Sequence, residues 1–218
     1  MKLRIIACAL LTTGLGAGLA GCGGDSGTGA RIDTRTQARL QEILSRNLRL
    51  PDGFTARPQE PWRVPFTARD KRCKALLAVA GGKVPKEALT AQAAVSYPGH
   101  GVGETAGVAL ATYAGAGAET HLDDLGADLA ACQKVAVGGG TRLKLRTTPV
   151  KEVGDEAVGG RLRGRLNGFP YALNVLFVRD GDTLLSLVHT GVSPVDLKRT
   201  EQLARSVLSR AQEGQGLT

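Results

Sequence analysis

The chain has 218 residues and a formal net charge of +8, with 42% hydrophobic and 4% aromatic residues. This length suits one domain with a full-sized core rather than several domains. The basic excess is moderate, and outside the cytoplasm it favours anionic headgroups or wall polymers as partners over nucleic acid. We therefore expect no nucleic-acid partner.

The first segment is typical of an export signal. Lys2 and Arg4 precede an apolar run, residues 5–15, that is too short to span a bilayer. Small residues follow, up to Leu19-Ala20-Gly21-Cys22, which resembles the lipobox of bacterial lipoproteins, where a diacylglycerol is joined to the cysteine thiol and cleavage leaves that cysteine first. We therefore predict a signal peptide over residues 1–21 and a lipid anchor (palmitate-type acyl chains) at Cys22, which hold the protein on the extracytoplasmic face of the cell membrane. The alternative is an ordinary secretory signal with an incidental cysteine.

The predicted compartment determines what we expect of the remaining cysteines. Cys8 leaves with the signal and Cys22 takes the lipid, so Cys73 and Cys132 are left. Two thiols in an oxidising compartment most often pair, and we predict a structural disulfide between them. The alternative is a redox or metal-binding thiol pair, but the sequence has no Cys-x-x-Cys motif and no histidine at ligand spacing. We expect no metal and no cofactor.

The middle of the chain alternates between helical and extended patterns. Residues 22–34 are rich in Gly, Ser and Thr and form a flexible tether. Apolar residues then recur at helical spacing at residues 35–48, 69–80 and 118–132. Strands are predicted at residues 93–97 and 108–113.

Two features of this region invite a ligand-binding interpretation. The Gly-rich loop of residues 98–104 lacks the Lys-Ser/Thr of a phosphate loop, so we interpret it as a hairpin connection. Trp62, the single tryptophan, lies in a Pro-rich extended segment. A lone aromatic residue between prolines is more often a lid on the core than a ligand platform, and we interpret Trp62 in this way.

From residue 142 the hydrophobic period changes from 3.6 to 2, which is typical of strands. The Asn167-Gly168 turn and the apolar residues 169–179 predict an antiparallel meander that ends with residues 183–190. A last helix is expected to open at Ser193 as N-cap, with Pro194 in its first position. The fold class is therefore α+β, one domain with helices packed on an antiparallel sheet. The domain spans residues 35–212, and a tail follows at 213–218.

Six basic residues alternate with other residues on two of these strands. They are Arg142, Lys144 and Arg146 on the first and Arg161, Arg163 and Arg165 on the second. If the two strands pair, the period of two places all six on one face of the sheet. Like charges opposite each other are unfavourable, so such a face favours a phosphate, carboxylate or headgroup as counter-charge, which arginine binds in bidentate fashion. The alternative is a solvated face with mobile counterions, whether or not the two strands are neighbours.

Catalysis has little support in the sequence. There is no Gly-x-Ser-x-Gly or His-Glu-x-x-His motif, and His100, His121 and His189 are scattered over a loop, a helix and a strand. Ser186 and His189 are three apart on a predicted strand, so they face opposite sides. We therefore expect no enzyme. Two function classes remain: a tethered ligand-binding or sensor module for an anionic envelope component, and a lipid carrier or accessory subunit with an apolar cavity.

The order of landmarks resembles a known family. Four short motifs carry the resemblance: Leu50-Pro51-Asp52-Gly53-Phe54, the stretch LGADLAAC that ends at Cys132, Val153-Gly154-Asp155-Glu156-Ala157, and Val178-Arg179-Asp180-Gly181-Asp182. They are similar to those of actinobacterial sensor-like lipoproteins related to the extracellular domain of PknH-type kinases. The resemblance implies helices on an antiparallel sheet around a cleft, and a sensing role. Those domains carry two disulfides, whereas this chain has cysteines for one. We expect any signalling to pass through a membrane-protein partner, because the sequence shows no kinase domain.

Overall fold

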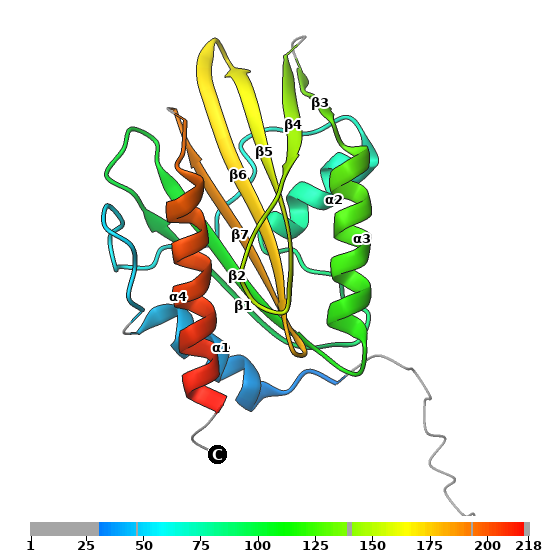
Figure 1. Ribbon diagram of the computed structural model, residues 1–218, viewed down its shortest axis with the longest axis vertical. Coiled ribbons are helices and arrows are strands. Elements are labelled where there is room, and N and C mark those ends of the chain that lie inside the picture. The colour runs from blue at the N-terminus through cyan, green and yellow to red at the C-terminus, as the bar shows by residue number, and fades with distance from the viewer. Residues whose placement is uncertain (1–30, 47, 139–140, 193, 216–218) are drawn as a thin grey trace, which may run out of the picture.

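The computed structural model describes residues 31–46, 48–138, 141–192 and 194–215. The α+β prediction is confirmed: four helices pack on a seven-stranded antiparallel sheet with the strand order β1-β2-β7-β6-β5-β4-β3 (Figure 1). The elements are α1 (Thr34–Ser45), α2 (Lys71–Ala80), β1 (Leu89–Pro98), β2 (Thr105–Tyr113), α3 (Gly117–Ala131), β3 (Lys134–Ala136), β4 (Arg142–Thr148), β5 (Glu156–Leu166), β6 (Phe169–Asp180), β7 (Thr183–Gly191) and α4 (Leu197–Gln215). The signal peptide, Cys22 and most of the tether lie outside the described residues.

Aspartates begin three of the four helices. The Asp33 carboxylate accepts a hydrogen bond from the Arg35 N–H of α1, and the Asp70 carboxylate accepts one from the Cys73 N–H of α2, both at 2.9 Å. Each carboxylate satisfies an N–H group that the helix itself cannot pair. In α4 the same role falls to Asp196, which accepts from the Lys198 N–H at 2.9 Å. The predicted start of this helix was therefore too early: Pro194 precedes it, and Ser193 lies outside the described residues.

The sheet joins the predicted hairpin to the predicted meander. β1 and β2 form the hairpin around residues 99–104, and β4 to β7 form the meander, with the Asn167-Gly168 turn between β5 and β6. Both turn residues have positive φ, which suits a tight hairpin. β2 pairs with β7, so β7 lies in the middle of the sheet and every one of its residues is buried.

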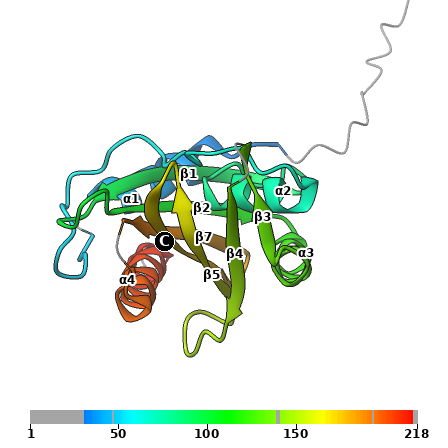
Figure 2. The ribbon, with the colours of Figure 1, turned by 90° about the horizontal axis from the view of Figure 1, so that it is seen from above.

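Each face of the sheet has its own core. Side chains alternate along β6, so Leu176 and Val178 pack with α1 and α4, whereas Val175 and Phe177 pack with α2 and α3. Figure 2 shows α4 and α3 on opposite sides of the β5–β4 end of the sheet. α1 and α4 cover β1, β6 and β7, which leaves the β4–β5 end of their face uncovered.

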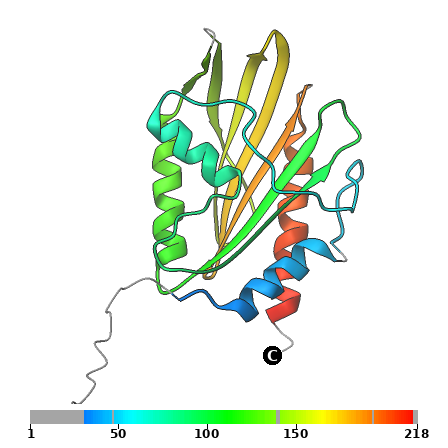
Figure 3. The ribbon, with the colours of Figure 1, turned by 180° about the vertical axis from the view of Figure 1, so that it is seen from behind.

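A disulfide bond lies in the core between the sheet and the helices α2 and α3. Cys73 of α2 is bonded to Cys132, which directly follows α3, and their Cα atoms are 5.3 Å apart. The predicted disulfide is confirmed. Residues 57–69, which we call the strap, run from the edge of β1 towards α2 on this same face (Figure 3). Trp62 on the strap is partly buried and packs against this core, as expected for a lid.

Some boundaries differ from those predicted. β3 was missed, because three residues carry too little pattern to be recognised. β5 begins at Glu156, five residues before the first of its basic residues, Arg161. α4 continues to Gln215, so it enters the segment assigned to a C-terminal tail.

Candidate functional site

The two basic strands are neighbours. β4 pairs with β5 so that Lys144 lies opposite Arg163 and Arg146 lies opposite Arg161. Leu143, Leu145 and Leu162 alternate with them and are buried against α3 on the other side of the sheet. The period of two therefore places the basic side chains on the face that α4 leaves uncovered. We call Arg142, Lys144, Arg146, Arg161, Arg163 and Arg165 the basic face.

The basic face has no internal counter-charge. Among the described residues, none of its six cations forms an ion pair with a carboxylate. Its neighbours on β6 are uncharged, since Arg161 lies opposite Asn174 and Arg163 opposite Ala172. The Nε atom of Arg161 is buried and bonds to no described atom. Like charges directly opposite each other are destabilising, so this arrangement costs folding free energy.

A hollow lies over this face. It has a volume of about 530 Å³ and is lined by Lys144, Arg146, Thr147, Thr148, Arg161, Arg163 and Gly164. Arginine donates in a planar fork that matches phosphate and carboxylate, and lysine and threonine add single donors. The lining offers hydrogen-bond donors to an anion and contains no acidic side chain.

Protection of a sheet edge is the simplest alternative explanation. β3 is short, so β4 beyond Leu145 lacks a partner strand on that side, and charged side chains on such an edge discourage aggregation. This accounts for Arg146 but not for Lys144, which is paired with β3 opposite Lys134. It does not account for Arg161 and Arg163, because β5 is paired along both edges.

A second polar cluster lies under the N-terminus of α4 and was not recognised from the sequence. Glu104 Oε1 accepts hydrogen bonds from His189 Nε2 at 2.9 Å and from Arg199 Nη1 at 2.8 Å. The Arg199 guanidinium also lies 4.7 Å from the centre of the Phe54 ring, which meets the His189 ring edge-on. The cluster ties the hairpin loop, β7 and α4 together.

The hydrogen bond to Glu104 assigns one proton of His189. An ionised carboxylate can only accept, so Nε2 carries a hydrogen, and Nδ1 lies 3.0 Å from the Thr200 hydroxyl. Burial disfavours the imidazolium and lowers the pKa of His189 below 6.5, although Glu104 opposes this. Burial raises the pKa of Glu104, but bonds from His189 and the Gly101 N–H together with the charge of Arg199 outweigh it, and the pKa falls below its usual 4.5.

The Thr200 hydroxyl, the His189 imidazole and the Glu104 carboxylate form a series that resembles a catalytic relay. This series, however, faces the interior of the protein. Thr200 and His189 are fully buried, and the Thr200 hydroxyl lies 2.9 Å from the Asp196 carbonyl of its own helix. A nucleophile must reach its substrate, so this cluster is structural. His100 is exposed in the hairpin loop, and His121 on α3 contacts the Glu87 carbonyl. Ser186 and His189 lie on opposite faces of β7, as predicted.

Two further findings concern metal ligands and membrane spans. Within the described residues, no three His, Cys, Asp or Glu side chains are grouped to hold a metal ion. None of the helices that the structure describes is long and apolar enough to cross a membrane. Cys22 lies outside the described residues, so its lipidation stays a prediction.

The fold is similar to that of a solved structure along most of its length. The crystal structure of the extracellular domain of PknH from Mycobacterium tuberculosis superposes with a TM-score of 0.51 over 84% of this chain and 93% of that chain, at 10% sequence identity. This chain has the fold of a PknH-type extracellular domain. The resemblance inferred from the four motifs is confirmed at the level of the fold.

Other comparisons add less. An X-ray structure of an uncharacterized protein from Mycobacterium smegmatis, an Rv0999 ortholog, superposes with a TM-score of 0.41 over 70% of this chain and 80% of that chain, at 13% identity. No protein-family model and no curated protein matches the sequence.

Proposed function

We propose that this protein is a non-catalytic, extracytoplasmic ligand-binding module whose basic face binds an anionic component of the cell envelope. One observation carries the proposal: Lys144 and Arg146 lie directly opposite Arg163 and Arg161, and no described carboxylate pairs with any of them. Folding gains nothing from bringing these charges together, so a ligand that supplies the counter-charge is the best explanation.

The extracytoplasmic location has two supports. The PknH neighbour is an extracellular domain, and the Cys73–Cys132 bond is of the kind that persists in oxidising compartments. A domain tethered outside the membrane meets phosphate-rich headgroups and wall polymers. Both match the donors of the basic face.

Vesicle binding tests the proposal. The Cys22→Ala protein, which carries no lipid anchor, should sediment with phosphatidylglycerol vesicles and not with phosphatidylcholine vesicles, and added salt should weaken the binding because the attraction is electrostatic. Changing Arg161, Arg163 and Arg165 together to Ser should reduce the bound fraction about tenfold or more. The control changes Arg35, Arg49 and Arg57 to Ser, which removes the same charge from exposed sites elsewhere. Equal losses in both variants would mean that net charge, and not the basic face, determines binding.

The lipid anchor is a separate part of the proposal. Signal cleavage before Cys22 and acylation of its thiol would hold the domain at the membrane surface on a short tether. Changing Cys22 to Ala should release the protein into the medium. If that variant stayed associated with the membrane in high-salt buffer, the lipid-anchor proposal would be wrong, and the proposal for the basic face would not be affected.

A lipid carrier is the second candidate function. It is favoured by a different hollow, an apolar groove beside Trp62. This groove lies on the α2 face, opposite the basic face, so the two candidates can be tested independently. For either candidate, we propose that a membrane-protein partner passes the signal to the cell.

A further inference from the structure

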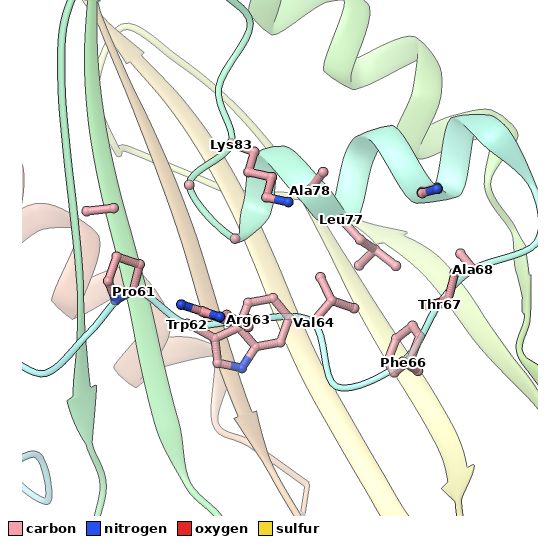
Figure 4. A pocket seen from close by; sticks show the side chains of 14 residues that line it. Pro61, Trp62, Arg63, Val64, Phe66, Thr67, Ala68, Leu77, Ala78 and Lys83 are labelled. Carbon is pink, nitrogen blue, oxygen red and sulfur yellow. The ribbon is translucent and has the colours of Figure 1, made fainter.

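An apolar groove separates the strap from α2. Trp62 and Val64 on the strap lie opposite Leu77 and Ala78 on the helix (Figure 4). The groove has a volume of about 620 Å³, within the range of about 300–1,000 Å³ found for small-molecule sites. It opens to solvent along the strap, where Trp62, Val64 and Phe66 are only partly buried.

Small residues explain why the groove stays open. A Cβ atom at Gly107 would lie 2.6 Å from the Trp62 Cβ, so only glycine lets the strap approach β2 this closely. Ala78, Gly81 and Gly82 also line the groove, and none of them carries a side chain larger than a methyl group. The strap therefore packs closely on β2 at Trp62, and the indole ring of Trp62 lines the groove.

The polar residues that line the groove are almost all cations. Arg63, Lys74 and Lys83 line it, and no acidic residue does. Arg63 forms one ion pair, with Glu60 at 3.6 Å, but both side chains are 87% exposed and such a pair is weak. Lys74 and Lys83 form no ion pair with any described residue.

We infer that the strap groove binds a single-chain amphiphile with an anionic head. The apolar walls take the chain, because burying it removes apolar surface from water. Lys74 and Lys83 are compact point charges that attract a carboxylate or a phosphate without demanding one geometry. The inference makes the second candidate function specific, and it does not depend on the basic face.

Trp62 reports on its own site. Because it is the only tryptophan, its emission can be followed while the full chain is titrated with four probes that share a ten-carbon alkyl chain: decanoate, decyl phosphate, decanol and decyltrimethylammonium. Each probe is kept below its micelle concentration or its solubility limit. Both anions should shift the emission at concentrations at least about tenfold lower than the cation does. Tighter binding of decanoate would indicate a fatty acid as the natural ligand. Tighter binding of decyl phosphate would indicate a lysophospholipid. Equal affinity for the cation and the anions would overturn the inference.

Matched variants test the binding of the ligand's alkyl chain separately from the binding of its head group. Ala78→Leu fills the groove and should abolish binding of all four probes, whereas Ala75→Leu, on the exposed side of α2, should bind as before. Lys74→Gln with Lys83→Gln should weaken the anions about fivefold and leave decanol unchanged, and Lys71→Gln with Lys86→Gln is the control.

The serine variant of the basic face, at Arg161, Arg163 and Arg165, should bind decanoate normally. Its failure to do so would point to a loss of fold or to one shared anion site. Unchanged affinity of a folded Ala78→Leu protein would exclude the groove.

Discussion

Arginines occur in two contrasting settings in this protein. At the N-terminus of α4, Arg199 lies 2.8 Å from Glu104, and at the end of β6 Arg179 contacts Asp155 at 3.0 Å and Glu156 at 3.3 Å. At the β4–β5 end of the sheet, Arg161 and its neighbours have no described carboxylate as partner. The residue type is the same, and only the supply of acids differs.

The difference separates stability from function. Where acid and base meet in a partly buried site, removing one leaves the other desolvated and unpaired, so both contribute to the fold. Where cations face only cations, removing one relieves repulsion, so folding does not explain their presence. Four predictions test this contrast.

The largest expected effect concerns the disulfide, which supports the open end of the sheet. Cys132 lies between α3 and β3, and β3 is the strand beside β4. The bond closes a loop with a sequence separation of 59, so Cys73→Ala with Cys132→Ala should lower the free energy of unfolding by about 4 kcal/mol. Urea denaturation measures this. A loss below about 1 kcal/mol would show that the bond does not constrain the unfolded chain.

The next effect lies in the paired region. Glu104→Gln removes the charge that His189 and Arg199 share, and should cost about 2–3 kcal/mol of unfolding free energy. Glu60→Gln breaks an ion pair with Arg63 that is almost fully exposed, and should cost less than about 0.5 kcal/mol. Similar losses in the two variants would contradict a structural role for the cluster.

The paired region should also make stability depend on pH. Burial lowers the pKa of His189 below 6.5, so the unfolded state takes up the proton first. The stability from the neutral ring is therefore complete above pH 6.5 and is lost as the pH falls through the lowered pKa. The lowered pKa of Glu104 adds a loss of the same sign below pH 4.5. Urea midpoints between pH 7.5 and 5 should fall less steeply in His189→Asn, and an unchanged slope would exclude His189 as the cause.

The smallest effect lies in the unpaired region. Arg161, Arg163 and Arg165 changed together to Ser should alter the free energy of unfolding by less than about 0.5 kcal/mol, or raise it slightly, because repulsion is relieved. The same variant loses vesicle binding in our proposal. A large loss of stability here would mean that these arginines hold the fold together through contacts other than ion pairs.

Local patterns predicted the elements of the fold but not all of their contacts. Alternation identified both basic strands, and the Asn-Gly pair at residues 167–168 identified the turn, but whether the two strands were neighbours stayed open. Glu104 and His189 are 85 residues apart, and only the pairing of β2 with β7 brings them together. Their partnership could not be predicted, because a glutamate at the end of a Gly-rich loop and a lone histidine in an apolar strand are ordinary locally. The groove beside Trp62 depends on Gly107, which is distant along the chain.

The most direct test of the proposed function is to map the residues to which an anionic headgroup binds. Soluble dihexanoyl phosphatidylglycerol can be titrated into the isotope-labelled full chain while backbone amide shifts are followed by NMR. Our account predicts that the shifted amides cluster on β4 and β5, around residues 142–148 and 159–166. Shifts confined to other regions, or none at millimolar headgroup, would contradict it.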